Sequence, residues 1–264
     1  MRPWQNGVLM TVKELYELFC ERIPEDLSEE WDNDGIMCCP DTEREVGRVL
    51  LSLDVTDEIV DYAVKGGFDL IISHHPLVFH KLSGINAEDH VSRKLMRLIT
   101  EGISVFSFHT RADRVQGGVN DCLARLLGLT DVQPLGESGL GRIGRLEGSD
   151  VTSIEDFAYR VKSVLGQERL LVSSAYCPVK CVAVVGGDGK DCLKEAIFEG
   201  ADTFVSGRIG YNIMEEAPEM GINMIEAGHY ATEFPVLSFF SALLRKFDAR
   251  IYSETVSSYV IRTV

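Results

Sequence analysis

Four of the six histidines stand where strands of a parallel sheet are expected to end. His74 and His75 follow the apolar run DLIIS. His109 follows ISVFSF, and His229 follows INMIEA and one glycine. In open parallel sheets, functional groups gather just beyond the carboxyl ends of the strands. We therefore expect these imidazoles to occupy equivalent points of the fold and to contribute to one site.

Two carboxylates accompany the histidines. Asp113 and Glu233 each follow a strand-end histidine by four residues. Neighbouring residues on an extended segment point in opposite directions, so His74 and His75 cannot easily converge on one ion. They can reach two ions about 3.5–4 Å apart, the usual separation in two-metal sites, which carboxylates can bridge. The pattern predicts two divalent transition-metal ions, and the ligand types suit Zn, Fe, Mn or Ni equally.

Each of these residues also has an ordinary structural interpretation. A lone histidine at a strand end is more often a hydrogen-bonded structural residue, and an aspartate after a strand is usually a turn or cap residue. Glu233 falls where the helix FPVLSFFSALLRKF is expected to begin. Thr232 could cap that helix, and the helix dipole favours a carboxylate there. The combination of residues, rather than any single one, carries the metal hypothesis.

The elements that position these residues recur in the chain. Residues 49–75 and 182–208 align without a gap at a shift of 133. Each copy has a continuous apolar run, an amphipathic stretch, a glycine and a second apolar run, which predicts strand–helix–strand. Any two such units share a pattern, but the matched glycines and aspartates favour duplication. The alignment pairs Val49 with Val182, Gly67 with Gly200, Asp69 with Asp202 and Ser73 with Ser206.

The predicted fold class is α/β: two related β-α-β lobes, an internal duplication with parallel sheets and a dinuclear metal site between the lobes. Third strands are expected over 103–108 and 222–227. The predicted domains are 1–128, with His74, His75 and Asp113, and 129–264, with His229 and Glu233. The Gly-rich stretch 128–149 is interpreted as a connector, although GRIGRL within it could be a short strand. The terminal SYVIRTV is interpreted as a final strand that could return to either sheet, including that of the first lobe.

Composition excludes several classes of protein. The net charge of −15 argues against general nucleic-acid binding, because no excess of Lys or Arg exists to release counterions. No apolar stretch reaches the roughly 18 residues of a membrane span. The start has no signal-peptide pattern, so we expect a cytoplasmic protein. Seven cysteines without framework spacing are interpreted as buried, reduced thiols.

Four segments together resemble a known family. WDNDG, HHPLVFHKL, HTRAD with GGVNDCLARLLGL, and GHYATE are similar to the GTP cyclohydrolase 1 type 2 homologues, also called NGG-one-interacting-factor-three-like proteins. The resemblance covers nearly the whole chain and matches the short form of the family. It implies a two-lobed subunit with a dinuclear metal centre, assembled as a homohexameric ring. The metal ligands that it implies, with Glu233 as the bridge, are His74, His75, Asp113, His229 and Glu233.

Two arginines depart from the family pattern. Where the family often has HTNLD, this chain has HTRAD with Arg111. Where the family often has an S/T-G-D strand end and then a histidine, this chain has Arg208 and Asn212. A guanidinium fits phosphate or carboxylate bidentately, so we expect an anionic small-molecule ligand to reach from the metals to one arginine. The alternative is that both arginines are surface charges.

The sequence leaves two classes of function open. A metal-dependent hydrolase is favoured slightly, and the family name suggests attack on the imidazole ring of GTP. His109 could then be a general acid or base, or only a hydrogen-bond partner of Asp113. The alternative is a non-enzymatic metal-binding or protein-interaction scaffold. No Walker motif exists, and the Gly-rich 186–189 fits a tight turn better than a phosphate cradle.

Overall fold

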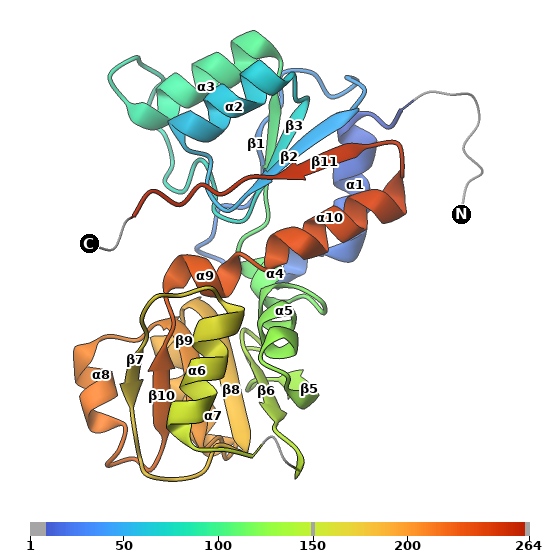
Figure 1. Ribbon diagram of the computed structural model, residues 1–264. Coiled ribbons are helices and arrows are strands. Elements are labelled where there is room, and N and C mark those ends of the chain that lie inside the picture. The colour runs from blue at the N-terminus through green and yellow to red at the C-terminus, as the bar shows by residue number, and fades with distance from the viewer. Residues whose placement is uncertain (1–8, 149–150, 262–264) are drawn as a thin grey trace. The chain divides into compact units, whose positions relative to one another are not determined.

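A computed structural model describes residues 9–148 and 151–261 of this chain (Figure 1). Contacts divide the chain into two compact units. The first unit comprises Met1–Ala112 and Leu237–Val264, and the second comprises Asp113–Val236. This division differs from the predicted boundary at 128/129. The reason is packing: the helix before residue 128 belongs to the core of the second unit, and the C-terminal helix belongs to that of the first.

The first unit is built on a five-stranded mixed sheet. Its three central strands and one edge strand run parallel, whereas the other edge strand, β1, pairs antiparallel with β4. We expected a wholly parallel sheet, and that expectation is wrong at this edge. In spatial order the strands are β1 (Gly35–Cys38), β4 (Ser104–Ser107), β3 (Leu70–Ser73), β2 (Arg48–Ser52) and β11 (Tyr252–Thr255).

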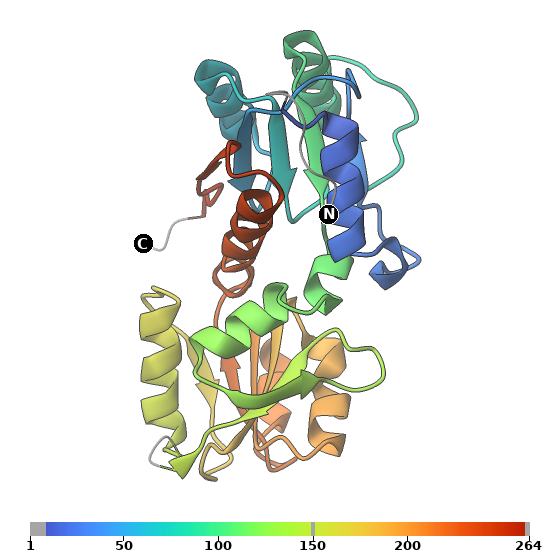
Figure 2. The same cartoon turned by 90° about the vertical axis from the view of Figure 1, so that its right-hand side faces the viewer.

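Helices cover both faces of this sheet (Figures 1 and 2). One face packs against α2 (Asp57–Gly66) and α3 (His90–Glu101) through an aliphatic cluster. The other face packs against α1 (Val12–Arg22) and α10 (Val236–Phe247) through stacked and edge-on aromatic rings. Phe240 of α10 lies 5.8 Å from Phe108, ring centre to ring centre. This aromatic packing assigns the C-terminal helix to the first unit.

The second unit is built on a six-stranded mixed sheet. Its centre is parallel, and its outer pairs are antiparallel. The alternative strand interpretation of GRIGRL is confirmed as β6, and the described part of the supposed connector also forms β5 of this sheet. In spatial order the strands are β5 (Thr130–Pro134), β6 (Arg142–Arg145), β8 (Cys181–Asp188), β9 (Thr203–Arg208), β10 (Asn223–Glu226) and β7 (Leu171–Ser173).

Two buried clusters lie on the two faces of the second sheet. One joins α5 (Val119–Leu126) and α6 (Ile154–Val164) to β8, β9 and β10. The other joins α7 (Leu193–Phe198) and α8 (Tyr211–Glu216) to the opposite face of the same strands. Figure 2 shows α6 in yellow and the orange helices on opposite sides. The remaining short helices are η1 (Glu25–Leu27), α4 (Thr110–Arg114), η3 (Lys190–Cys192) and α9 (His229–Glu233).

The internal repeat is present at the level of strand register. Val49 pairs with Leu70 across β2 and β3, and residues 182 and 203, each 133 positions later, pair across β8 and β9. Asp69 accepts hydrogen bonds from the backbone N–H groups of residues 47 and 48, at 2.9 and 3.0 Å. Asp202 accepts from those of residues 180 and 181 in the same way. The matched aspartates thus fix the start of the first strand in each copy.

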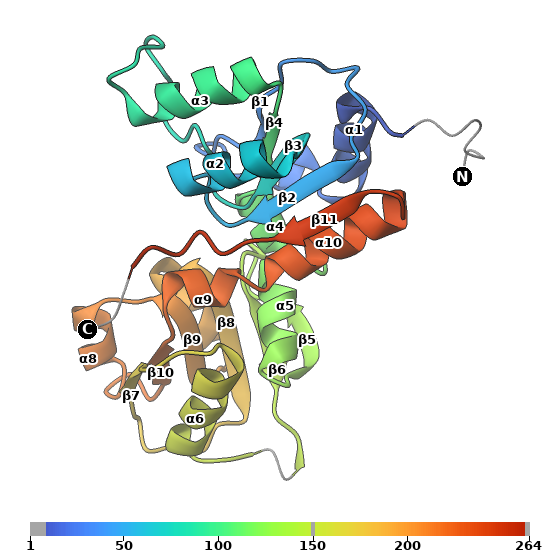
Figure 3. The same ribbon diagram turned by 45° about the horizontal axis from the view of Figure 1, so that its top comes forward.

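The C-terminal segment differs from the prediction. Among the described residues, the last strand is β11, which lies beside β2 (Figure 3). Residues 258–261 are not in a strand, and residues 262–264 lie outside the described residues. Within the described ranges, no helix is both long and apolar enough to cross a membrane. All seven cysteines fall in those ranges and are free thiols.

Candidate metal centre

Three imidazoles converge at the carboxyl ends of β3 and β4 in the first unit. The ring centres of His74 and His75 lie 4.9 Å apart. The ring of His109 lies 5.3 Å from that of His74 and 5.7 Å from that of His75. One nitrogen from each ring can be chosen so that all three lie within 4.8 Å of one another. This group could hold a metal ion.

Each of the three rings is held through its Nδ1 atom by an oxygen acceptor. His74 Nδ1 lies 2.9 Å from the backbone oxygen of Phe108. His75 Nδ1 lies 2.8 Å from Asp54 Oδ1, and His109 Nδ1 lies 2.8 Å from Asp32 Oδ1. Carbonyl and carboxylate oxygens only accept, so in a neutral imidazole the proton is placed on Nδ1. The lone pair is then on Nε2, the arrangement that metal-ligating histidines commonly have.

Asp54 lies two residues beyond the end of β2, as His109 lies two residues beyond the end of β4. Its carboxylate is held from a distant part of the first unit, because Ser258 Oγ donates to Asp54 Oδ2 at 3.0 Å. The Asp54 N–H in turn donates to Ser258 Oγ at 3.1 Å. The backbone of His75 is fixed as well, through a hydrogen bond from its N–H to the carbonyl of Leu53. The orientation of His75 therefore depends on the segment after β2 and, through Asp54, on Ser258 of the C-terminal segment.

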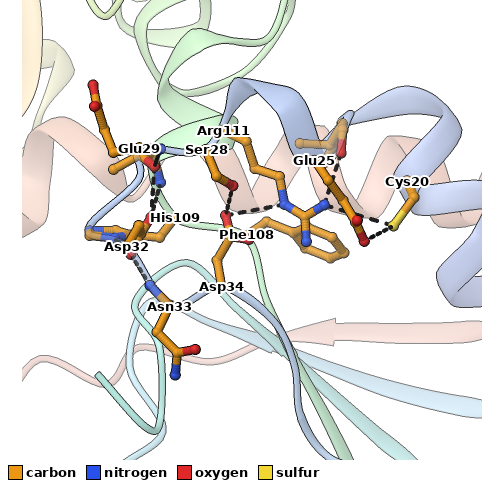
Figure 4. A network of polar contacts seen from close by, with 12 residues as sticks. Cys20, Glu25, Ser28, Glu29, Asp32, Asn33, Asp34, Phe108, His109 and Arg111 are labelled. Carbon is orange, nitrogen blue, oxygen red and sulfur yellow. Dashed lines mark hydrogen bonds and ion pairs between the residues drawn. The ribbon is translucent and has the colours of Figure 1, made fainter. Parts of the chain in front are cut away.

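Asp32 lies in the loop between η1 and β1 and joins that loop to the end of β4 (Figure 4). Besides His109, its carboxylate accepts from the N–H and the hydroxyl of Thr110, at 3.1 and 2.7 Å. Burial alone would raise the pKa of Asp32, but the hydrogen bonds from His109 and Thr110 outweigh burial and hold the pKa well below its usual range. Asp32 is therefore a carboxylate that would stabilise a positive charge on His109.

The second unit presents a histidine and a carboxylate together on α9. His229 Nε2 lies 3.2 Å from Glu233 Oε1, one helical turn away. Gly187, at the end of β8, adopts a φ of 64°, and a Cβ there would overlap the Glu233 carboxylate. Thr232 lies within α9, and its hydroxyl accepts from the N–H of Gly187 at 3.1 Å. The backbone of β8 thus fits closely against the His229–Glu233 pair.

A sequence model of one family spans nearly the whole chain. The model for Duf34/NIF3 (NGG1p interacting factor 3) matches residues 10–263. This chain belongs to the Duf34/NIF3 family. The resemblance found in the sequence motifs is thereby confirmed.

Relatives within the Duf34/NIF3 family are similar over most of their length. A "GTP cyclohydrolase 1 type 2 homolog" from Clostridium perfringens is 35% identical over 235 residues, which cover 86% of this chain and 88% of the relative. A protein of the same name from Methanocaldococcus jannaschii is 30% identical over 247 residues, covering 92% and 99%.

Solved structures of NIF3-related proteins have the same fold. A Bacillus cereus protein related to NIF3 matches with a TM-score of 0.88 at 22% identity, covering 98% of this chain and 99% of that one. Reduced HcgD from Methanocaldococcus jannaschii matches with a TM-score of 0.81 at 28% identity, covering 94% and 99%. This NIF3-family chain therefore shares its fold with solved structures.

Arg111 is not available to an anionic ligand, and this is a correction to the sequence prediction. Its side chain is fully buried in the first unit, with Nε 3.1 Å from Asp34 Oδ2 (Figure 4). The guanidinium also donates to the carbonyl of Ile23 at 3.2 Å and lies over the ring of Phe108. Burial raises the pKa of Asp34 above its ordinary value, although Arg111 opposes that shift. Arg111 is neither a surface charge nor a ligand contact but part of the core.

The remaining predicted residues are distributed over both units. Arg208 is exposed at the end of β9, so its proposed contact with an anion stays a prediction. Asp113 is half-buried on α4 and belongs to the second unit, so its role as a ligand also stays a prediction. His109 hydrogen bonds to Asp32 and joins the group of three histidines. The sequence left open two interpretations of His109, an acid–base role or a hydrogen bond to Asp113.

Sequence reasoning did not select Asp32 and Asp54, which orient two of the three imidazoles. Asp54 stands at a strand end, so the rule that selected the histidines could have found it. Asp32 is part of the WDNDG segment, but nothing local marks its contact with His109, which is 77 positions away.

Proposed function

We propose that this NIF3-family protein is a metal-dependent hydrolase with a two-metal centre. His74, His75 and Asp113 would bind the ions together with His229 and Glu233, and Glu233 would be the bridge. The observation that carries the proposal is the orientation of the His74 and His75 imidazoles in the first unit. Each has its Nδ1 held by an oxygen, as metal-binding histidines do.

The residues of this chain would divide the work between binding and proton transfer. Two divalent ions would supply Lewis-acid activation of water when bound. We assign His109 the role of general acid or base, because the Asp32 carboxylate holds its ring in place. Arg208, exposed at the end of β9, would contact an anionic group of the substrate.

We further propose GTP as the first substrate to assay, since the relatives bear the name GTP cyclohydrolase 1 type 2 homolog. Apo protein would be loaded with Zn, Fe(II), Mn or Ni in turn, and GTP turnover and metal content would be measured on the same samples. Close to two ions per chain and turnover are expected. Metal binding without turnover of GTP or of a small-metabolite panel would instead favour the metal-binding scaffold.

The bridging role of Glu233 has its own test. Glu233→Gln should lower the occupancy of both ions, because a bridging carboxylate serves both. Glu215→Gln, an exposed change on α8, should leave the metal content unchanged. Loss of only one ion in Glu233→Gln would assign the bridge to another residue. His109→Gln should keep both ions and lose turnover, whereas loss of one ion would make His109 a ligand.

A further inference from the structure

Two exposed aromatic side chains stand beside His109 in the first unit. The exposed fractions of Trp31 and Phe79 are 62% and 43%. Their ring centres lie 6.2 and 6.1 Å from that of His109, and 6.2 Å from each other. The angles between ring planes are 60° for Trp31 with Phe79, and 79° and 82° with His109. The three rings therefore form a corner rather than a flat stack.

The segments that carry the two aromatic residues are held by hydrogen bonds on either side. Asp32, next to Trp31, is bound to His109 and Thr110. The amide of Asn33 donates to the carbonyl of Val78, which precedes Phe79. The two loops are thus fixed to each other and to the end of β4. Trp31 and Phe79 are therefore exposed on loops whose backbones are held in place by hydrogen bonds.

Large apolar surfaces left in water next to polar groups are the usual lining of a small-molecule site. Such sites combine aromatic walls with a few convergent polar groups, and here the polar groups are the three imidazoles. Aromatic side chains with open faces bind planar bases by stacking, without needing hydrogen bonds to the ring. A heteroaromatic ring resting on this corner would be held beside His109.

We propose that Trp31 and Phe79 form the stacking surface for a planar heteroaromatic ring of the purine class. This inference rests on the proposed function, since it names the part of the substrate that lies beside the metal centre. It assigns the recognition of the ring to the first unit. It also separates recognition of the ring from recognition of the anion, for which Arg208 is proposed.

The chain offers a direct spectroscopic readout, because it contains only two tryptophans. Trp4 lies outside the described residues, and Trp4→Phe makes Trp31 the only tryptophan emitter. Metal-free Trp4→Phe protein would be titrated with guanosine 5′-monophosphate and, separately, with ribose 5-phosphate, which carries the same sugar and phosphate without the base. Saturable quenching of Trp31 by the nucleotide alone is expected. Equal effects of both compounds, or no effect of either, would overturn the proposal.

Equilibrium dialysis with guanosine 5′-monophosphate tests the two side chains without fluorescence. Trp31→Leu and Phe79→Leu should each weaken binding about tenfold, as loss of one stacking contact predicts. Phe198→Leu, which alters an exposed phenylalanine of the second unit, should not weaken it. Unchanged binding in Trp31→Leu or Phe79→Leu contradicts the proposal, and concentration-dependent blue-shifted Trp31 emission without nucleotide binding would indicate a self-association surface instead.

Metal uptake, measured after separate reconstitution of the same protein preparations, keeps the two proposals separable. Nucleotide binding by a protein that takes up no metal would refute the metal-dependent hydrolase and leave the stacking surface intact. Metal uptake without nucleotide binding would refute the stacking surface and leave the metal-dependent hydrolase intact. Neither aromatic variant should change the number of ions bound, because neither side chain offers a metal-ligand atom.

Discussion

Asp32 Oδ1 lies 2.8 Å from His109 Nδ1 and joins two residues that are 77 positions apart in the chain. The same carboxylate also binds the first residue of α4. It therefore orients the imidazole and anchors the turn that follows β4. Asp54 orients His75 in the same manner, at the same distance.

Removing either orienting carboxylate should disturb the imidazole that it holds without removing a ligand. We expect Asp54→Asn, which affects the proposed ligand His75, to lower the affinity for metal about 10–100-fold, the usual effect of losing such a partner. Asp32→Asn, which affects the proposed acid–base residue His109, should instead lower turnover and leave the metal affinity unchanged. The amide would also favour the wrong tautomer whenever its NH₂ group faces Nδ1. Competition with a metal-chelating dye measures the affinity. Asp57→Asn, an exposed change on α2, is the control and should match wild type.

The close fit between Gly187 and Glu233 predicts that a methyl group added at residue 187 will lower metal content. Gly187→Ala should displace the Glu233 carboxylate and lower metal content, because the added Cβ would overlap that carboxylate. Gly200→Ala is a matched control, since Gly200 also has a positive φ, 81°, but no atom within 4 Å of the added Cβ. Both variants should lose about 1 kcal/mol of stability from backbone strain. Metal analysis and urea unfolding separate the two effects, and equal metal content in both would contradict the prediction.

Removing one partner of the buried Arg111–Asp34 pair should lower the free energy of unfolding. Arg111→Met leaves the Asp34 carboxylate buried without its cation, so we expect a loss of about 3–5 kcal/mol in the free energy of unfolding. The double variant Arg111→Met/Asp34→Leu should recover much of that loss, because no buried charge is left unpaired. Urea unfolding measures both. A double variant no more stable than the single one would show that the remaining contacts of Arg111, to Ile23 and Phe108, dominate.

Two buried thiols should be alkylated only at a higher pH than an ordinary cysteine. Burial raises the pKa of Cys38 and of Cys192 to about 11, from an ordinary value of 9.0. At pH 8 roughly one molecule in a thousand would carry either thiolate, the form that reacts with iodoacetamide. Labelling of both should rise about tenfold per pH unit up to pH 10. The neighbouring, less buried Cys39 is the internal control and should label first at pH 8.

The same shifts have a consequence for stability. The folded pKa values exceed the unfolded ones, so the unfolded chain loses protons first as the pH rises. The contribution of these neutral thiols to stability is therefore complete below pH 9.0 and declines as the pH approaches 11. Replacing both by alanine should flatten the fall in unfolding free energy over this range. A fall of the same steepness in the variant would assign it to other groups.

Local patterns determined the parallel cores of both units and the edge at which the histidines gather. A strand buried on both faces must be a continuous apolar run, and an amphipathic helix must follow it to cover the sheet. These constraints act over a few residues, so they can be read along the chain. The repeat made them stronger, because Asp69 and Asp202 make the same backbone contacts in each copy.

Tertiary structure alone decided which groups surround the histidines. The pairing of His109 with Asp32, and of His75 with Asp54, depends on loops that meet only after the sheet has formed. Arg111 looked like a charge beside the site, yet packing placed it in the core, where Asp34 neutralises it. The boundary between the units was likewise set by the aromatic packing of α10. Such partners lie far apart in sequence, and the free energy that selects them comes from burial and long-range hydrogen bonds rather than from local pattern.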